Sequence, residues 1–279
     1  MLVKRTQGDI KPSGDRKTKF WDGQLNTFGL LPGPDGTCPN ATCGDGGCWQ
    51  IRAGRKNPTC YVTKIMAAYP GVRGCLEYNT NLLKSCKTVK EMATLLTREL
   101  NRFVAAEDRR CAILKKPRQL YYRIHWSGDM FNDMYAAAWR MAIRRHRNVT
   151  FWVYTRSFSS IKYLQSEPNV KLSLSLDKIN LKKGLVAFDK LLEHSAGKHA
   201  HALSPGLTLF STRSDLADMK AAIARHYSNK PTHRKFNVKG CPANTSDRLE
   251  FMCSRCQRCV TDKHYKNYNI DVVWFEYKE

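Results

Sequence analysis

The sequence of 279 residues lacks an apolar run of 18 residues, the length that a transmembrane helix needs. Residues 1–19 are polar and charged, so they lack the apolar region of a signal peptide. Acidic residues are scarce: Asp and Glu number 24 against 47 Lys and Arg, a formal net charge of +23. We therefore expect a soluble cytoplasmic protein without a membrane partner. The positive charge favours a polyanion, with DNA first; a merely soluble basic surface is the alternative.

The chain has eleven cysteines, an odd number, so they cannot all form pairs within the chain. Without an export signal we expect no disulfide framework. The single residues Cys75, Cys86 and Cys111 are expected to be small buried hydrophobes. The other eight form two groups of four, which in a reducing compartment indicate metal or iron–sulfur sites: Cys38, Cys43, Cys48 and Cys60, and Cys241, Cys253, Cys256 and Cys259.

The second group has the more specific spacing. Cys253-x2-Cys256-x2-Cys259 follows the run of ferredoxin-type iron–sulfur sites, whereas zinc sites usually use two separated pairs. An iron–sulfur cluster is the first interpretation, and zinc or no metal are the alternatives. The interspersed Arg255 and Arg258 would offset thiolate charge or contact phosphate.

The first group lies in a glycine-rich loop, where glycines let a short segment wrap around a bulky inorganic group. Its spacings of x4, x4 and x11 fit no common zinc pattern. A cluster held by three of these cysteines would leave one iron open to a small molecule. A purely structural metal loop is the alternative.

Strands and helices are predicted to alternate after an irregular segment, 1–37. Thr88-x-x-Glu91 has the form of a capping box that opens a helix to about Ala106. Alternation at spacings of 20 to 30 residues predicts parallel βαβ units and the α/β class. The expected strands are 120–129, 149–156, 170–177, 201–204, 207–212 and 270–277, the last of them at an edge of the sheet. The expected helices are 132–145, 159–166, 185–194 and 214–227.

Three consecutive predicted strands carry polar side chains on one face, as in Lys171, Ser173, Ser175 and Asp177. Buried parallel strands are normally apolar on both faces, so this pattern predicts a partial (β/α) barrel lined for a polar ligand near the strand ends. A sheet with one wet face is the alternative. The corresponding polar residues of the other two strands are Arg123, His125, Ser127 and Asp129, and Trp152, Tyr154 and Arg156.

Several segments of the chain form a further pattern: Cys38-Pro-Asn-Ala-Thr, Cys60-Tyr-Val-Thr-Lys, Tyr69-Pro-Gly-Val, Asn79-Thr-Asn-Leu-Leu, Arg123-Ile-His-Trp-Ser-Gly-Asp, Phe151-Trp-Val-Tyr-Thr-Arg-Ser and Cys241-Pro-Ala with the closing cysteines. Together they resemble a phage-encoded family related to radical S-adenosylmethionine (radical SAM) enzymes. The resemblance covers residues 36 to 260, and the order of its segments is more specific than any one of them. The usual signature Cys-x3-Cys-x2-Cys is absent, and four cysteines are available for three places.

The resemblance implies a partial barrel at 38–235 with a [4Fe-4S] cluster near its N-terminal loop, and a cysteine-rich extension at 236–279. It implies that S-adenosylmethionine binds the open iron, that Ser127, Gly128 and Asp129 meet its amine, and that a reductant such as flavodoxin or ferredoxin supplies electrons. The extension could hold a second iron–sulfur cluster or zinc. The other implied cofactor or substrate contacts are Tyr154, Arg156, Ser173 and Ser175, and the implied catalytic groups are His125, Asp129 and Asp177.

The resemblance also implies a DNA base as substrate, such as a thymine carrying an N-linked glycine that is isomerised to a C-linked form, a hypermodification that protects phage DNA from host restriction. Trp126, Trp152 and Tyr154 could stack on an extruded base, or could simply pack the barrel. Two alternatives stay open. One is a zinc-dependent, transglycosylase-like enzyme with Asp129 or Asp177 as nucleophile. The other is a non-enzymatic nucleic-acid-binding protein with two structural metal sites.

Overall fold

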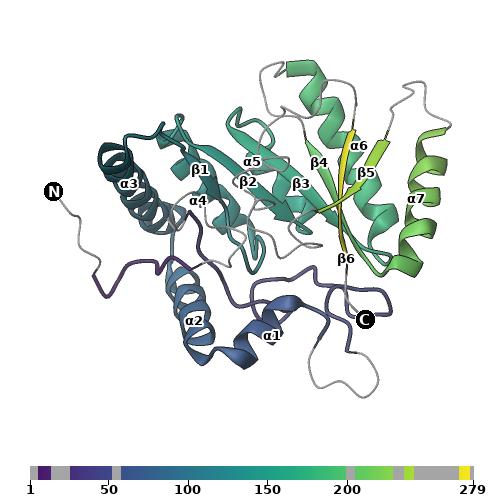
Figure 1. Cartoon of the computed structure of the whole chain (residues 1–279), viewed down its shortest axis with the longest axis horizontal. Coiled ribbons are helices and arrows are strands. Elements are labelled where there is room, and N and C mark those ends of the chain that lie inside the picture. Colours follow the sequence, from purple (N-terminus) through teal and green to yellow (C-terminus); the bar gives the residue numbers. More distant parts are fainter. Residues whose placement is uncertain are drawn as a thin grey trace.

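The computed structural model describes residues 6–13, 26–51, 58–198, 205–228, 236–241 and 270–276 (Figure 1). Its helices are α1 (Tyr61–Ala68), α2 (Pro70–Ser85), α3 (Val89–Leu114), α4 (Asp133–Arg145), α5 (Ile161–Leu164), α6 (Leu181–Lys198) and α7 (Arg213–Ser228), with a 3-10 turn η1 (Phe158–Ser160). Its strands are β1 (Tyr121–Arg123), β2 (Thr150–Thr155), β3 (Val170–Leu176), β4 (Gly206–Ser211), β5 (Phe236–Gly240) and β6 (Ile270–Glu276).

The strands form one six-stranded sheet in the order β1-β2-β3-β4-β6-β5, and every neighbouring pair is parallel. The predicted α/β class with parallel βαβ units is therefore confirmed. The expectation that the last strand lies at an edge is wrong, because β6 pairs with β4 on one side and β5 on the other. Strand β5 was not predicted, and the predicted strand 201–204 lies outside the described residues.

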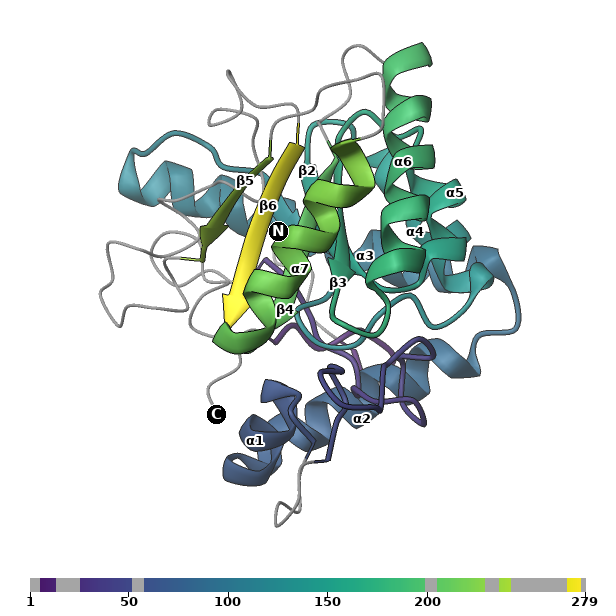
Figure 2. The same cartoon turned by 90° about the vertical axis from the view of Figure 1, so that its right-hand side faces the viewer.

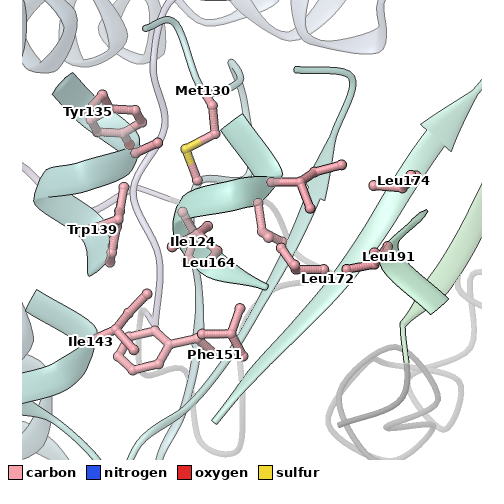
Figure 3. Packing of buried hydrophobic residues seen from close by; sticks show 14 of the residues in the cluster. Ile124, Met130, Tyr135, Trp139, Ile143, Phe151, Leu164, Leu172, Leu174 and Leu191 are labelled. Atoms are coloured by element: carbon pink, nitrogen blue, oxygen red, sulfur yellow. The ribbon is translucent and has the colours of Figure 1, made fainter. Parts of the chain in front are cut away.

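One face of the sheet packs against helices and carries the main core. On β3, Val170, Leu172, Leu174 and Leu176 are all buried on this face, and each such residue contributes about 1.5–3 kcal/mol on burial. Figure 3 shows Phe151 of β2 beside Ile143 of α4, with Tyr135 and Trp139 further along that helix. The alternation of apolar and polar side chains therefore locates the core of the sheet correctly.

Helix α3 begins as its sequence predicts. The Thr88 hydroxyl accepts the Glu91 N–H at 3.1 Å, while the Glu91 carboxylate accepts the Lys87 N–H at 2.8 Å. The helix is longer than predicted: it ends at Leu114, and its last buried residue is Glu107, which accepts hydrogen bonds from Arg110 and from the Gln119 N–H. Helices α1 and α2 were not predicted. Pro70 begins α2, where its missing N–H costs nothing.

The segment 26–30 runs beside β1 without forming a regular strand, and an isolated parallel bridge joins Thr27 to Arg123. Arg123 N–H donates to the Asn26 carbonyl at 2.9 Å, and Leu30 N–H donates to the Ser127 carbonyl at 2.9 Å. This pairing carries the chain to the carboxyl end of β1 and directly into the cysteine loop, which we define as residues 31–51. In Figure 2, β6 points toward the end of the molecule where this loop, α1 and α2 lie.

Strand β1 is shorter than predicted, because regular pairing stops at Arg123. His125 then adopts φ of 64°, a left-handed conformation that interrupts the extended chain. Within the described ranges, no helix is both long enough and apolar enough to cross a membrane.

Candidate functional site

The cysteine loop is fastened to the carboxyl ends of the strands. Asp177, which follows β3 and is completely buried, accepts the hydroxyl hydrogen of Thr42 and the N–H of Cys48, the latter at 3.2 Å. The Asn40 side chain donates to the Ser157 hydroxyl at 3.2 Å. These bonds place the loop at the edge of a parallel sheet where ligands usually bind.

Three of the four loop-region thiols lie close enough to interact. Both Cys48 and Cys60 raise the pKa of Cys38, and Cys48 also raises that of Cys60. Cys43 is different: its side chain is exposed, and its sulfur lies 4.0 Å from the Ala41 carbonyl oxygen. The tertiary structure thus selects Cys38, Cys48 and Cys60, which we call the thiol trio, from four cysteines that the sequence could not separate.

Burial favours the protonated form of two of these thiols, Cys38 and Cys60. It is the largest cause that raises the pKa of Cys60 to about 11 and the pKa of Cys38 well above its ordinary value. Backbone N–H groups oppose the shift: that of Gly33 points at Cys38, and those of Val62 and Thr63, at the start of α1, point at Cys60. Amide donors and a helix N-terminus are what a thiolate ligand needs once a metal displaces its proton.

The turn after β1 fits closely against the cysteine loop. Ser127 donates its hydroxyl to the Leu30 carbonyl at 2.7 Å. Gly128 has φ of 86°, and a Cβ there would lie 2.7 Å from Leu30 Cβ and would also clash with the Thr37 hydroxyl. Ser127 and Gly128 are therefore occupied in holding the loop beside β1.

Asp129 is buried beside the thiol trio, and its negative charge raises the pKa of Cys38. Its Oδ1 accepts the Met130 N–H at 2.7 Å and the Thr155 hydroxyl at 2.6 Å, and its Oδ2 accepts the Arg156 N–H at 2.8 Å. Burial raises the pKa of Asp129, while these hydrogen bonds oppose the rise. Within the described part of the chain, Oδ2 has a single donor, so it can accept one more.

Arg156 connects the two carboxylates. Its backbone N–H binds Asp129, and its guanidinium forms a buried ion pair with Asp177. The guanidinium also lies over the Phe210 ring, 5.4 Å from the centroid, and favours the thiolate form of Cys60. Arg156 is thus a positive charge shared by two buried carboxylates and one thiol.

His125 lies on the core side of the site and not among the thiols. It is buried and stacks on Tyr135 with 6.4 Å between ring centroids. Burial, together with the positive charge of Arg123, lowers the pKa of His125 to about 3. Among the described residues, neither ring nitrogen has a hydrogen-bond partner of normal geometry. A neutral imidazole in this position is a poor proton acceptor at neutral pH.

The remaining predicted contacts line the sheet face opposite the helices, which we call the inner face. Ser173 and Ser175 of β3 are buried there, and Tyr154 of β2 is half-buried. Trp126 lies elsewhere, packed on Leu76 and Val62, with its indole N–H donated to Ser13 at 3.1 Å.

Of the second cysteine group, the structure describes one member. Cys241 is buried directly after β5, whereas Cys253, Cys256 and Cys259, with Arg255 and Arg258, lie outside the described residues. Cys75, Cys86 and Cys111 were expected to be buried, but each is only partly so. The described ranges contain no group of three or more His, Cys, Asp or Glu side chains that could hold a single metal ion as it stands.

Sequence reasoning missed two residues that build the site. Thr42 accepts the Cys48 N–H at 3.0 Å and donates to Asp177, and Thr155 binds Asp129 from the neighbouring strand. Thr155 directly precedes the predicted Arg156 and could have been found at the strand end. Thr42 is the last residue of the segment Cys38-Pro-Asn-Ala-Thr quoted for the resemblance, but the sequence assigned it no role.

The fold and site define a parallel α/β protein whose strand ends hold a cysteine loop with three mutually interacting thiols. The chain matches the family described as "Gene product 88" over residues 1–262, and it belongs to that family. It is 34% identical to the "Gene 88 protein" of Mycobacterium phage L5 over 184 residues, 62% of this chain and 70% of the relative. It is 33% identical to the "Gene 88 protein" of Mycobacterium phage D29 over 175 residues, 59% and 65% respectively.

These relatives support a bacteriophage origin for the chain. No solved structure gives a significant match. The phage-encoded part of the predicted resemblance is thereby confirmed, and its relation to radical SAM enzymes stays a prediction.

Proposed function

We propose that this chain is an iron–sulfur enzyme of the radical SAM type that modifies bases in phage DNA. The observation that carries the proposal is the separation of Cys43 from the thiol trio. Three protein ligands on a four-iron cluster leave one iron open, which is the requirement for binding a small-molecule cofactor. A cluster ligated by four cysteines would have no such position.

The residues around the thiol trio fit a [4Fe-4S] cluster. Cys38, Cys48 and Cys60 would hold it, and the amide donors at Gly33 and at the start of α1 would balance the thiolate charge. When bound, such a cluster supplies the electron that cleaves S-adenosylmethionine to a 5′-deoxyadenosyl radical, which removes hydrogen from an unreactive carbon. The protein contributes position and shielding.

Asp129 is the group that we assign to the cofactor amine. Its Oδ2 can accept one more donor, and it lies close enough to Cys38 to raise that thiol's pKa. Gly128 permits the close approach of the loop, and Ser127 ties the loop to the end of β1. The parallel sheet with segment 26–30 beside β1 is consistent with the partial (β/α) barrel that the resemblance implies.

We assign a DNA base as substrate, and isomerisation of an N-linked glycyl-thymine to its C-linked form is the specific reaction proposed. The formal net charge of +23 supports contact with DNA. A flavodoxin or ferredoxin would deliver the electron, and the second cysteine group would hold a further cluster or zinc.

A zinc-dependent, transglycosylase-like enzyme is less well supported. That reaction needs a carboxylate free to attack, but Asp177 receives hydrogen bonds from Thr42, Cys48, Arg156, Ile179 and Asn180. Asp129 keeps one acceptor position, but hydrogen bonds from Met130, Thr155 and Arg156 already hold its carboxylate.

The test is iron, acid-labile sulfide and EPR analysis of anaerobically reconstituted protein, with and without S-adenosylmethionine. We expect a reduced-cluster signal that S-adenosylmethionine changes. The variants Cys38→Ser, Cys48→Ser and Cys60→Ser should each abolish the change. Cys43→Ser is the matched control from the same loop and should retain it.

Two results would overturn the proposal. Zinc without acid-labile sulfide would leave the transglycosylase-like and structural interpretations. Loss of the signal in Cys43→Ser to the same degree as in Cys38→Ser would mean four ligands and no open iron. A Cys253→Ser/Cys256→Ser/Cys259→Ser variant separates any iron at the second cysteine group from iron at the loop.

A further inference from the structure

The end of α4 and the turn after it gather three arginines around one carboxylate. Glu167 Oε1 accepts Arg140 Nε at 3.1 Å and Arg144 Nε at 2.8 Å. Its Oε2 accepts Arg147 Nη1 at 2.9 Å. The Glu167 side chain is 1% exposed, whereas those of the arginines are 38%, 48% and 50% exposed. A buried carboxylate thus holds three cations at the surface, and we call Arg140, Arg144 and Arg147 the arginine cluster.

The arginine cluster carries more positive charge than its carboxylate neutralises. Three guanidiniums share the single charge of Glu167, and residues 140–149 contain no Asp or Glu. Arg140 and Arg144 bind Glu167 through Nε, and among the described residues their terminal amino groups donate to no other side chain or carbonyl. Because a guanidinium has five N–H donors in one plane, each of these arginines can bind Glu167 and a second anion at once.

The arginine cluster lies at the amino-terminal edge of the sheet. Arg147 comes directly before β2, and Glu167 directly before β3. The cysteine loop is fastened to the opposite ends of the same strands, through Ser157 and Asp177 (Figure 2). The seven residues of β3 span about 20 Å at about 3.3 Å per residue, so the arginine cluster is a separate site from the thiol trio.

The neighbouring entry to the sheet is basic as well. Strand β1 is parallel to β2, so the segment between α3 and β1 reaches the sheet at the same edge as the arginine cluster. Lys115, Lys116 and Arg118 lie in that segment and are exposed, and Arg118 pairs with Asp108. Positive charge therefore follows the edge over two strand entries, a distribution that suits an extended polyanion better than a single small anion.

We infer that the arginine cluster binds the phosphate backbone of double-stranded DNA, at a site separate from the thiol trio. Arginine contacts to the backbone position DNA on a protein without reading its sequence. The inference rests on the proposed function in taking DNA as the polyanion, and it adds the surface that holds the duplex. A free phosphate ion has the same chemistry, and the experiment distinguishes the two.

The probe is a fluorescently labelled DNA duplex, titrated with the full chain and followed by anisotropy over a series of NaCl concentrations. Arg144→Gln/Arg147→Gln leaves Arg140 on Glu167 and should weaken binding by about tenfold or more. It should also lower the slope of log K against log salt by about two, one for each lost phosphate contact. The single variants Arg144→Gln and Arg147→Gln keep two arginines on Glu167, so they decide the question if the double variant lacks a cooperative thermal transition; each should lower the slope by about one.

Lys190→Gln/Lys220→Gln is the matched control, because it removes the same charge from exposed positions midway along α6 and α7. Equal weakening in this control would show general charge attraction and overturn the inference. Unchanged affinity in the folded arginine variants would also overturn it. Displacement of the duplex by inorganic phosphate, with ionic strength held constant by chloride, would assign the arginine cluster to a free phosphate and not to DNA.

The EPR signal with S-adenosylmethionine, recorded on the same preparations, separates this inference from the proposed function. The signal should persist in the arginine variants, because the cluster lies about 20 Å from the thiol trio. Its absence from the wild type contradicts the proposed function and leaves the DNA result to stand by itself. Unchanged DNA binding in the arginine variants with an intact signal contradicts this inference alone.

Discussion

The Asp177 carboxylate at the end of β3 accepts the backbone N–H of Cys48 at 3.2 Å, across 129 positions of sequence. The same oxygen pairs with Arg156 and with the Thr42 hydroxyl. One buried carboxylate therefore links two strand ends to the loop that carries two of the three interacting thiols. These contacts favour a positioning role for Asp177, which the sequence suggested as a catalytic residue.

Replacement of Asp177 by Ala should destabilise the protein by about 3–5 kcal/mol, because it leaves the buried Arg156 guanidinium without its partner. Urea unfolding measures the change. The double variant Asp177→Ala/Arg156→Met should recover part of the loss, since no buried charge then remains. If Asp177→Ala unfolds at the wild-type urea concentration, the ion pair does not hold the loop.

Gly128→Ala should lower stability and reduce iron retention in reconstituted protein. The new Cβ would meet Leu30 and Thr37, and φ of 86° is unfavourable for alanine. Gly74→Ala is the control, because a Cβ there meets nothing within 4 Å. Since Gly74 lies inside helix α2, this variant should be more stable than the wild type by about 0.5–1 kcal/mol. Thermal melting and iron analysis check both. Equal behaviour of the two variants would contradict the close fit of turn and loop.

His125 should make the protein acid-sensitive. Its pKa is about 3 in the folded state and near 6.5 when unfolded, so below pH 6.5 the unfolded chain binds a proton that the folded chain does not. Stability should therefore fall as pH decreases, by about 1.4 kcal/mol per unit, or about 3 kcal/mol near pH 4.5. His125→Asn, which tolerates the left-handed backbone, should remove this slope. Urea unfolding of the wild type and of His125→Asn between pH 7 and 4.5 tests this prediction. An equal loss of unfolding free energy in both proteins as the pH falls would refute it.

Glu167→Gln should destabilise the junction before β3. Glu167 is buried and lies within 3.1 Å of Arg140, 2.8 Å of Arg144 and 2.9 Å of Arg147. Because the arginines are about half exposed, water screens part of their repulsion, and we expect a loss of about 1–3 kcal/mol. Sulfate should restore more stability to the variant than to the wild type. Equal salt responses would mean that repulsion among the arginines is unimportant.

Much of the fold could be predicted from local sequence. The apolar alternation in β3 and the capping box at Thr88 both depend on residues adjacent in sequence. The strand and the start of helix α3 could therefore be predicted from local sequence. Helices α1 and α2 escaped prediction although α2 buries Leu76 and Leu83 on one side; Pro70 and Gly71 at their junction are residues typical of a turn. β5 escaped because it is five residues long and, among the described residues, its partner strand is β6, more than 30 positions later.

The sequence by itself determined the parallel α/β class, the polar face of the strands, the positive charge and the cysteine-rich loop. Only the tertiary structure decided which cysteines lie near enough to affect one another's pKa. Cys38 and Cys48 lie near Cys60 because hydrogen bonds from residues 40, 42 and 48 fasten the loop to Ser157 and Asp177. Those bonds join positions more than 100 residues apart, and no local spacing encodes them. Cys43 does not belong to the thiol trio for the same reason: the hydrogen bonds that hold residues 40, 42 and 48 leave its side chain exposed.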